Sequence, residues 1–135
     1  MKFLTRWSPQ LLSVLRIVSA LCFMEHGCVK LLHFPTSMGP GPLPPLMMFA
    51  GVLELVGGAL LALGLFTRPF AFILSGEMAV AYFMAHFPAS PYPVVNQGEA
   101  AVLYCFIFLY LAAAGGGAWS LDNLLFNRKR GLNPA

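Results

Sequence analysis

Charged residues are scarce in this sequence. Only 10% of its 135 residues are Asp, Glu, Lys or Arg, whereas about 25% of a typical soluble domain is charged. The apolar fraction is 59%, above the roughly 45–50% of a soluble domain. A soluble chain of this size buries only about two-thirds of the surface that its unfolded form exposes, so it could not cover this much apolar surface. The composition excludes an ordinary water-soluble domain and indicates lipid as the solvent.

Cysteines are also few, and they are not paired in the sequence. Cys22, Cys28 and Cys105 form no CxxC motif and no metal-ligand spacing, which argues against a dithiol redox motif or a zinc ribbon. We interpret them as small apolar fillers and predict no metal site. The basic residues form no patch interleaved with aromatic residues, so the sequence gives no indication of nucleic-acid binding.

Long apolar segments separated by proline-rich loops dominate the rest of the chain. A bilayer core of about 30 Å requires about 20 mostly apolar residues per helix. Ser8-Pro9 is a typical helix start, with a capping hydroxyl before a proline. We predict an all-α membrane four-helix bundle, formed as a single domain by residues 1–135. Its helices are expected at about 9–32, 46–66, 69–87 and 97–118.

The distribution of basic residues predicts the orientation of these helices. Cytoplasmic loops collect Lys and Arg, and Trp7 and Trp119 suit the inner interface, where indole rings are enriched. Both chain ends are therefore expected on the cytoplasmic side, with both proline-rich loops facing outward. The first segment resembles a secretory signal, but Arg16 would interrupt the apolar region of such a signal, so we expect the segment to be retained. The basic residues expected on the inner side are Lys2, Arg6, Arg68, Arg128, Lys129 and Arg130.

Arg16 and Glu77 fall inside apolar segments, where a charge at the membrane centre costs at least about 2.5–3.5 kcal/mol. Arg16 is about seven residues into the first predicted helix and Glu77 about eight into the third. At a rise of about 1.5 Å per residue, the two lie at matching depth. We therefore predict a buried Arg16–Glu77 ion pair, whose simplest role is structural: it would hold the first and third helices together.

The outer half of the predicted bundle carries more ionisable residues. Glu54 lies on a helix stripe of small residues that would let helices approach closely. Histidine changes its charge near neutral pH and binds metals, although two histidines without a third nearby ligand are a poor metal signature. We predict a polar ligand pocket that opens outward. Its expected members are His26, Lys30, Glu54, His86, Asn96 and Glu99.

Two of these residues have simpler explanations. Asn96-x-x-Glu99 matches the helix capping box, which alone would account for Glu99. Lys30 lies near the end of the first predicted helix, where a lysine can extend its ammonium group to the interface. Glu54 is the hardest of the set to explain without a partner or a function.

Taken together, the motifs resemble the DoxX family of small bacterial membrane proteins, over about residues 11–122. That resemblance implies a four-helix inner-membrane fold. The matching motifs are Leu15-Arg16, His26-Gly27 with Lys30-Leu31, Gly51-x-x-Glu54-x-x-Gly57-Gly58, Gly64-x-x-Thr67-Arg68-Pro69, the run from Met78 to Pro88, Tyr92-Pro93, Asn96-x-Gly98-Glu99, and Gly115-x-Gly117 leading to Ser120-Leu121-Asp122.

The resemblance favours one function and leaves another open. Some DoxX relatives are subunits of quinone-linked sulfur oxidation systems or belong to oxidative-stress complexes, which implies an accessory, redox-associated subunit of a membrane oxidoreductase. The sequence has no haem-ligand arrangement or flavin motif, so electron transfer would require a bound quinone or the cofactor of a membrane or periplasmic redox partner. The alternative is a non-catalytic scaffold or a carrier of a small ligand, and a homo-oligomer is compatible with either function.

Overall fold

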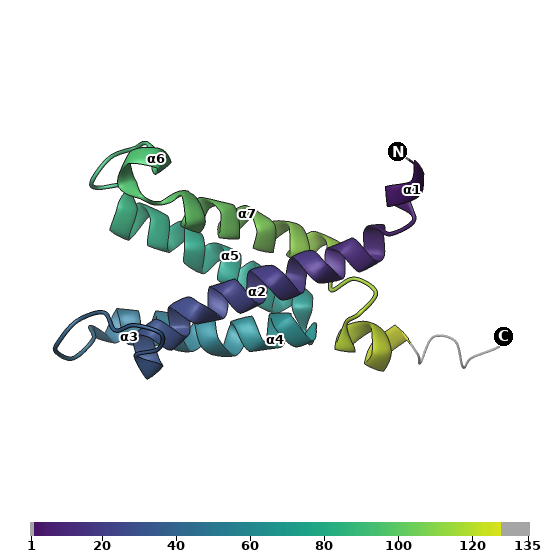
Figure 1. Cartoon of the computed structure of the whole chain (residues 1–135), viewed down its shortest axis with the longest axis horizontal. Coiled ribbons are helices and arrows are strands. Elements are labelled where there is room, and N and C mark those ends of the chain that lie inside the picture. Colours follow the sequence, from purple (N-terminus) through teal and green to yellow (C-terminus); the bar gives the residue numbers. More distant parts are fainter. Residues whose placement is uncertain (1, 128–135) are drawn as a thin grey trace.

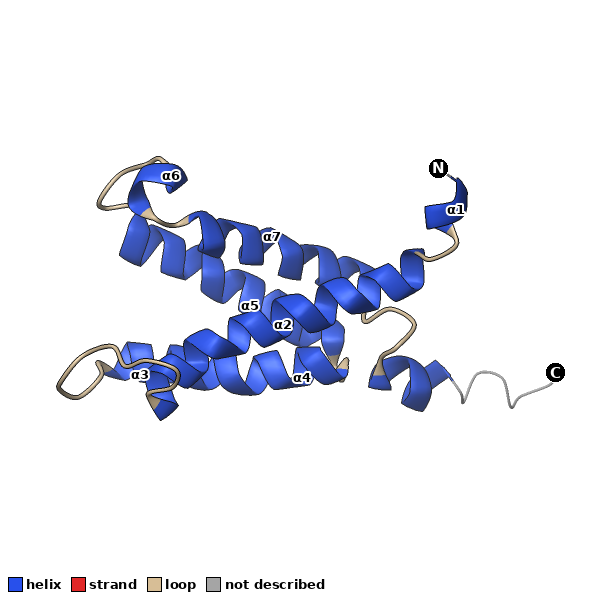
Figure 2. Ribbon diagram, in the orientation of Figure 1, coloured by secondary structure: helices blue, strands red, loops and turns tan. Residues whose placement is uncertain are grey.

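The computed structural model describes residues 2–127, and every regular element in that range is helical (Figures 1 and 2). The elements η1, η2 and η3 are single π-helical turns, in which one extra residue is accommodated. In chain order the elements are α1 (Lys2–Thr5), α2 (Ser8–Leu32), α3 (Pro45–Val52), η1 (Leu53–Gly57), α4 (Gly58–Leu63), α5 (Thr67–Ala81), η2 (Tyr82–His86), α6 (Pro93–Asn96), α7 (Glu99–Ala114) and η3 (Asn123–Asn127).

All four apolar segments are helical, but the last is shorter than expected. α2, the continuous run α3–η1–α4, the run α5–η2 and α7 correspond to the four predicted helices. The fourth was expected to reach residue 118, yet α7 ends at Ala114 because Gly115 and Gly117 have φ angles of 89° and 77°. Such angles leave the right-handed helix and are readily adopted only by glycine. The chain then stays at this end of the molecule and leads to η3 (Figure 1).

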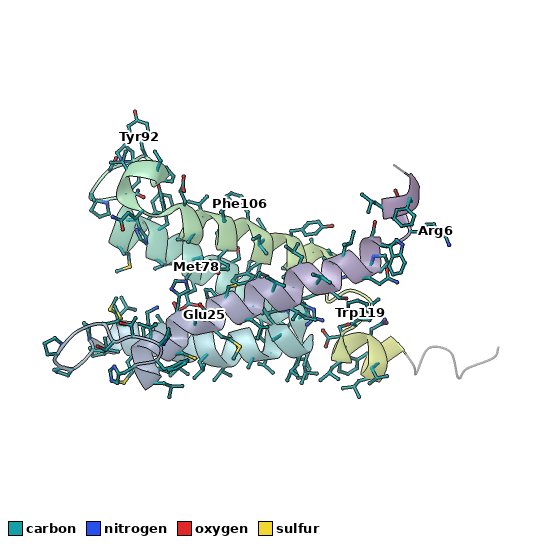
Figure 3. The ribbon with its side chains drawn as sticks, viewed as in Figure 1. Arg6, Glu25, Met78, Tyr92, Phe106 and Trp119 are labelled. Atoms are coloured by element: carbon teal, nitrogen blue, oxygen red, sulfur yellow. The ribbon has the colours of Figure 1, made fainter. Side chains whose placement is uncertain are left out.

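The helices are arranged as two packed groups (Figure 1). α2 packs against α3, η1 and α4, while α5 runs alongside α7. α1 and η3 lie at one end of the molecule, and the proline-rich loop of residues 33–44 lies with α6 at the other (Figure 1). Figure 3 shows Arg6 and Trp119 at the first end and Tyr92 at the second. Both proline-rich loops therefore share one end, as the sequence analysis expected.

The surface of the molecule is apolar, whereas much of its interior is polar. Phe72, Leu103 and Phe106 are more than half exposed, and Phe106 points away from the other helices (Figure 3). The fully buried residues include polar ones such as Ser13, Arg16 and Thr67. Two helices, Ser8–Leu32 and Pro45–Leu63, are long and apolar enough to cross a membrane. An apolar exterior around a polar interior is the arrangement expected of helices that lie in lipid.

Glycine lets α2 approach the α3–η1 run closely. A Cβ atom added at Gly27 would lie 2.8 Å from the Leu55 nitrogen and 2.9 Å from the Gly51 oxygen. Both contacts are with backbone atoms, which cannot rotate away as a side chain can. The small residues on the Glu54 stripe act as predicted here, because Gly51 and Gly58 pack against α2.

Gly27→Ala is expected to destabilise the folded protein by about 1–3 kcal/mol, as overpacking of a tight contact does. Gly76→Ala is the matched control, because no atom lies within 4 Å of the Cβ added at that exposed helical position. The measurement is the temperature at which each variant, purified in detergent, loses its monodisperse folded peak. If the two alanine variants melted alike, the packing role of Gly27 would be wrong.

Candidate functional site

A cavity of about 320 Å³ lies between the α3–η1 run and the α5–η2 run. Its size is at the lower end of the range for ligand pockets, about 300–1,000 Å³. Apolar side chains such as Met47, Met78 and Met84 make up most of the lining. Its ionisable residues are Lys30 from α2, Glu54 from η1 and Glu77 from α5. A mostly apolar wall with a few polar groups is typical of a small-molecule site.

Lys30 and Glu54 form a buried ion pair at one wall of this cavity. The Lys30 ammonium donates to Oε1 of Glu54, and the two side chains are 15% and 3% exposed. The other carboxylate oxygen of Glu54, Oε2, is buried and has no hydrogen-bond partner among the described residues. The pair neutralises both charges and still leaves one acceptor without a partner.

Glu77 also lines this cavity. Both of its carboxyl oxygens are buried, and neither takes part in a hydrogen bond within residues 2–127. A buried carboxyl group without a partner is rare in folded proteins and calls for an explanation such as a ligand or a catalytic role. Glu77 was expected to form an ion pair between two helices, so its place in this cavity was not predicted.

A π-helical turn contributes residues to the cavity from each side. η1 carries Glu54 and η2 carries Met84 and Ala85, all of which line it. Single π-turns inside α-helices occur frequently at functional sites. An apolar pattern with a period of 3.6 residues gives no sign of such turns, so the sequence did not predict them.

The structure does not form the expected Arg16–Glu77 ion pair. Arg16 is fully buried, and its guanidinium donates to backbone carbonyls at the end of α4 and after α7. Residue counts from the predicted helix starts did not give the relative depth of the two side chains: Arg16 contacts Leu61 and Ala62, whereas Glu77 lines the cavity beside Glu54, seven residues earlier in the same run and so about 10 Å away along the helix. The acceptors of Arg16 are the oxygens of Leu61, Ala62 (2.7 Å), Gly116 (2.8 Å) and Trp119 (2.6 Å).

His86 and Asn96 are brought together, but at the loop end and not in the cavity. Nδ1 of His86 lies 3.0 Å from the backbone oxygen of Asn96, so Nδ1 must carry the hydrogen. The Asn96 amide donates to the Ser90 oxygen at 2.7 Å, and its Oδ1 accepts the Gly98 N–H at 2.7 Å. Asn96 thus fixes the loop around α6. The alternative capping box with Glu99 is not formed, because the N-cap residue of α7 is Gly98 and not Asn96, and Glu99 is the first residue of the helix.

His26 and Glu99 lie outside the cavity and do not take part in the His86–Asn96 contact. His26 is exposed on α2, with its ring 6.1 Å from that of Tyr104. Glu99 is exposed in the first turn of α7. The six residues predicted to share one polar pocket are therefore divided among several places, and only Lys30 and Glu54 line the cavity.

A larger depression of about 860 Å³ lies at the end of the molecule near α1. Its charged residues already have partners. Asp122 accepts the backbone N–H groups of Phe66 and Thr67 at 2.7 and 2.8 Å, which caps α5, and Arg68 donates to the Ala113 oxygen at 2.7 Å. This arrangement holds the α4–α5 turn against the segment after α7. We therefore take the smaller cavity as the candidate site.

Comparison with known proteins identifies the family. The sequence profile of the DoxX family matches residues 11–87, more than half of the chain. The chain belongs to the DoxX family. The profile covers α2, α3, η1, α4, α5 and η2, so it includes Lys30, Glu54 and Glu77 of the cavity. This DoxX-family chain is a membrane protein, as its apolar exterior also indicates.

A bacterial relative resembles this DoxX-family chain along almost its whole length. A protein of Haemophilus influenzae, described as "Uncharacterized protein", is 48% identical over 134 residues, covering 95% of this chain and 100% of the relative. No solved structure matches the chain. Because the Haemophilus influenzae protein matches 95% of the chain, its similarity extends beyond residues 11–87 of the family profile and into α7.

Proposed function

We propose that this protein is a quinone-binding, redox-associated subunit of the bacterial inner membrane. In this proposal the four apolar helical segments cross the bilayer as a bundle, with both chain ends in the cytoplasm. Arg6 and Arg68 support the orientation, since they belong to the end that also holds α1 and η3, and cytoplasmic ends collect basic residues. The basic cluster of residues 128–130, which lies outside the described residues, follows η3 in the chain.

The observation that carries the proposal is the unpartnered Glu77 carboxyl in an apolar cavity. A quinone has a flat apolar ring and two carbonyl oxygens, so it needs an apolar slot with a few hydrogen-bond donors. A protonated Glu77 would donate to one carbonyl, and the Lys30 ammonium is a second donor on the opposite wall. The residues present therefore fit this class of ligand.

Glu77 would also serve the proton side of quinone chemistry. Reduction of a quinone to a quinol takes up two electrons and two protons, and a carboxyl group within hydrogen-bond reach can supply or accept a proton. The Lys30–Glu54 pair would keep the wall opposite Glu77 fixed. The electrons would come from a membrane or periplasmic redox partner, because the sequence has no flavin or haem-binding motif.

The test is quinone binding by the purified protein in detergent. A ubiquinone with a short isoprenoid tail is expected to raise the melting temperature of the wild-type chain. Glu77→Leu should weaken this binding about tenfold, the effect of losing one good hydrogen bond. Glu99→Leu is the matched control, since Glu99 is exposed and lies outside the cavity.

The outcomes separate the proposal from its alternative. Equal quinone affinity in wild type and Glu77→Leu would place the ligand elsewhere and overturn the assignment. Absence of both co-purified quinone and any thermal shift in the wild type would also overturn it. In that case, a stoichiometric protein partner found by crosslinking would favour the non-catalytic scaffold.

A further inference from the structure

Glu25 and His26 are both exposed on α2. Glu25 lies opposite the buried residues of that helix, and His26 lies at the flank of the same exposed face, next to Tyr104 of α7. Glu25, labelled in Figure 3, takes part in no hydrogen bond or ion pair within residues 2–127, and His26 contacts only the ring of Tyr104 among the aromatic residues described. Cys22 is exposed one turn before them, at the i−3 and i−4 positions that share a helix face. Val18 and Leu21, also exposed, continue this α2 face.

The depth of these residues makes their exposure significant. Glu25 lies about 10 Å from the Leu32 end of α2 and about 25 Å from its Ser8 end, at about 1.5 Å per residue. Both distances place it within a membrane-spanning helix. Ionisable groups at such positions face a bundle interior or a water-filled cavity and pair with other groups, because lipid solvates charge poorly. As a monomer, the chain would turn Glu25 toward lipid.

We propose that a second copy of this chain covers this face, in a two-fold dimer where Glu25 of each protomer pairs with His26 of the other. The two residues are adjacent in sequence, so they lie at nearly the same depth. A two-fold axis along the membrane normal brings groups of equal depth face to face and makes each contact twice. An imidazole N–H donates to a carboxylate whether the ring is charged or neutral.

A second copy fits this face better than an unrelated protein because the face is self-complementary: it carries both the acid, Glu25, and the base, His26, that would pair across a dimer interface. Apolar Val18 and Leu21 lie beside them. Interhelical hydrogen bonds and close packing are the interactions that associate helices in lipid. The proposal is independent of quinone binding, since neither Glu25 nor His26 lines the cavity.

Cys22 provides a native probe of this interface. In membranes, the Cys28→Ala and Cys105→Ala double variant retains Cys22 as its sole cysteine, and a short bis-maleimide is expected to crosslink it to a covalent dimer. Glu25→Ala in this background should weaken dimerisation about fivefold to tenfold, the effect of losing interhelical hydrogen bonds. The swap Glu25→His with His26→Glu should restore the dimer. Glu99→Ala, the matched acidic control, should leave it unchanged.

Three results would overturn the proposal. The first is a wild-type chain that stays monomeric in membranes, with no Cys22 crosslink. The second is crosslinking that is equal in the wild-type and Glu25→Ala backgrounds, and the third is capture of a different protein by Cys22. If Glu25→Ala failed to fold, the swap variant and the analogous His26→Ala change would still decide between pairing and its absence.

Discussion

Replacing Arg16 by lysine or alanine is expected to prevent stable folding of the protein. The guanidinium is fully buried and donates to four backbone oxygens. Leaving a buried acceptor without its donor costs about 1–3 kcal/mol each, so Arg16→Ala should cost at least about 4 kcal/mol, at the upper end of single-residue effects. The measurements are the amount of protein in the membrane fraction and its melting temperature in detergent.

Lysine should not rescue the alanine variant, although it keeps the charge. The planar guanidinium presents its donors in a fixed fork, whereas an ammonium group is a compact point charge on a flexible stem. The acceptors of Arg16 come from two separate segments, the end of α4 and residues 116–119. One ammonium group cannot reach all of them. A helix C-terminus is the negative end of its dipole, so α4 also favours a cation here.

Arg68 supplies the matched arginine control. It is exposed and donates to the Ala113 oxygen at 2.7 Å, with a longer contact of 3.4 Å to Ala112. Arg68→Ala should therefore change stability by less than about 1 kcal/mol, as is usual for exposed interactions. A stable, well-expressed Arg16→Lys protein, or an Arg68→Ala effect as large as that of Arg16→Ala, would contradict the role assigned to the four carbonyl contacts.

The sequence predicted the helical segments well because their physical causes are local. Apolar runs of about 20 residues and proline-rich breaks are visible directly in the chain, and they correspond to α2, the α3–η1–α4 run, the α5–η2 run and α7. The close approach at the glycines near Glu54 was equally predictable, since small residues on one helix face allow it. The end of α7 was placed too late, because the sequence does not show which glycine will adopt a positive φ.

The candidate site was predicted only in part because its contacts are not local. Lys30 and Glu54 do meet in the cavity, but Glu77 was given the wrong neighbour, and His86, at the end of η2, bonds to Asn96 of α6 instead. Arg16 finds backbone carbonyls as partners, and no sequence pattern marks a carbonyl as available. The same holds for Asp122, which caps α5 from more than fifty residues away. Neither the relative depth of Arg16 and Glu77 nor the rotation of each helix about its axis could be obtained by counting residues.

Removing one partner of the Lys30–Glu54 pair is expected to have the second-largest effect on stability. Breaking a buried ion pair costs about 3–5 kcal/mol because the remaining charge is left uncompensated. Lys30→Met should show this full cost, since Glu54 is 3% exposed in the middle of the Pro45–Leu63 helix and cannot reach water. The measurement is the unfolding transition of each variant in a denaturing detergent titration.

The two single variants should not be equivalent. Lys30 is 15% exposed and lies two residues from the end of α2, so without its partner its long side chain can extend toward the interface. Glu54→Met should therefore cost measurably less than Lys30→Met. The double variant should recover most of the lost stability, because replacing both members of a buried pair by apolar residues is often close to neutral. Equal single effects would contradict the escape of Lys30 to the interface, and a double variant equal to the sum of the two would show that the two side chains are not coupled.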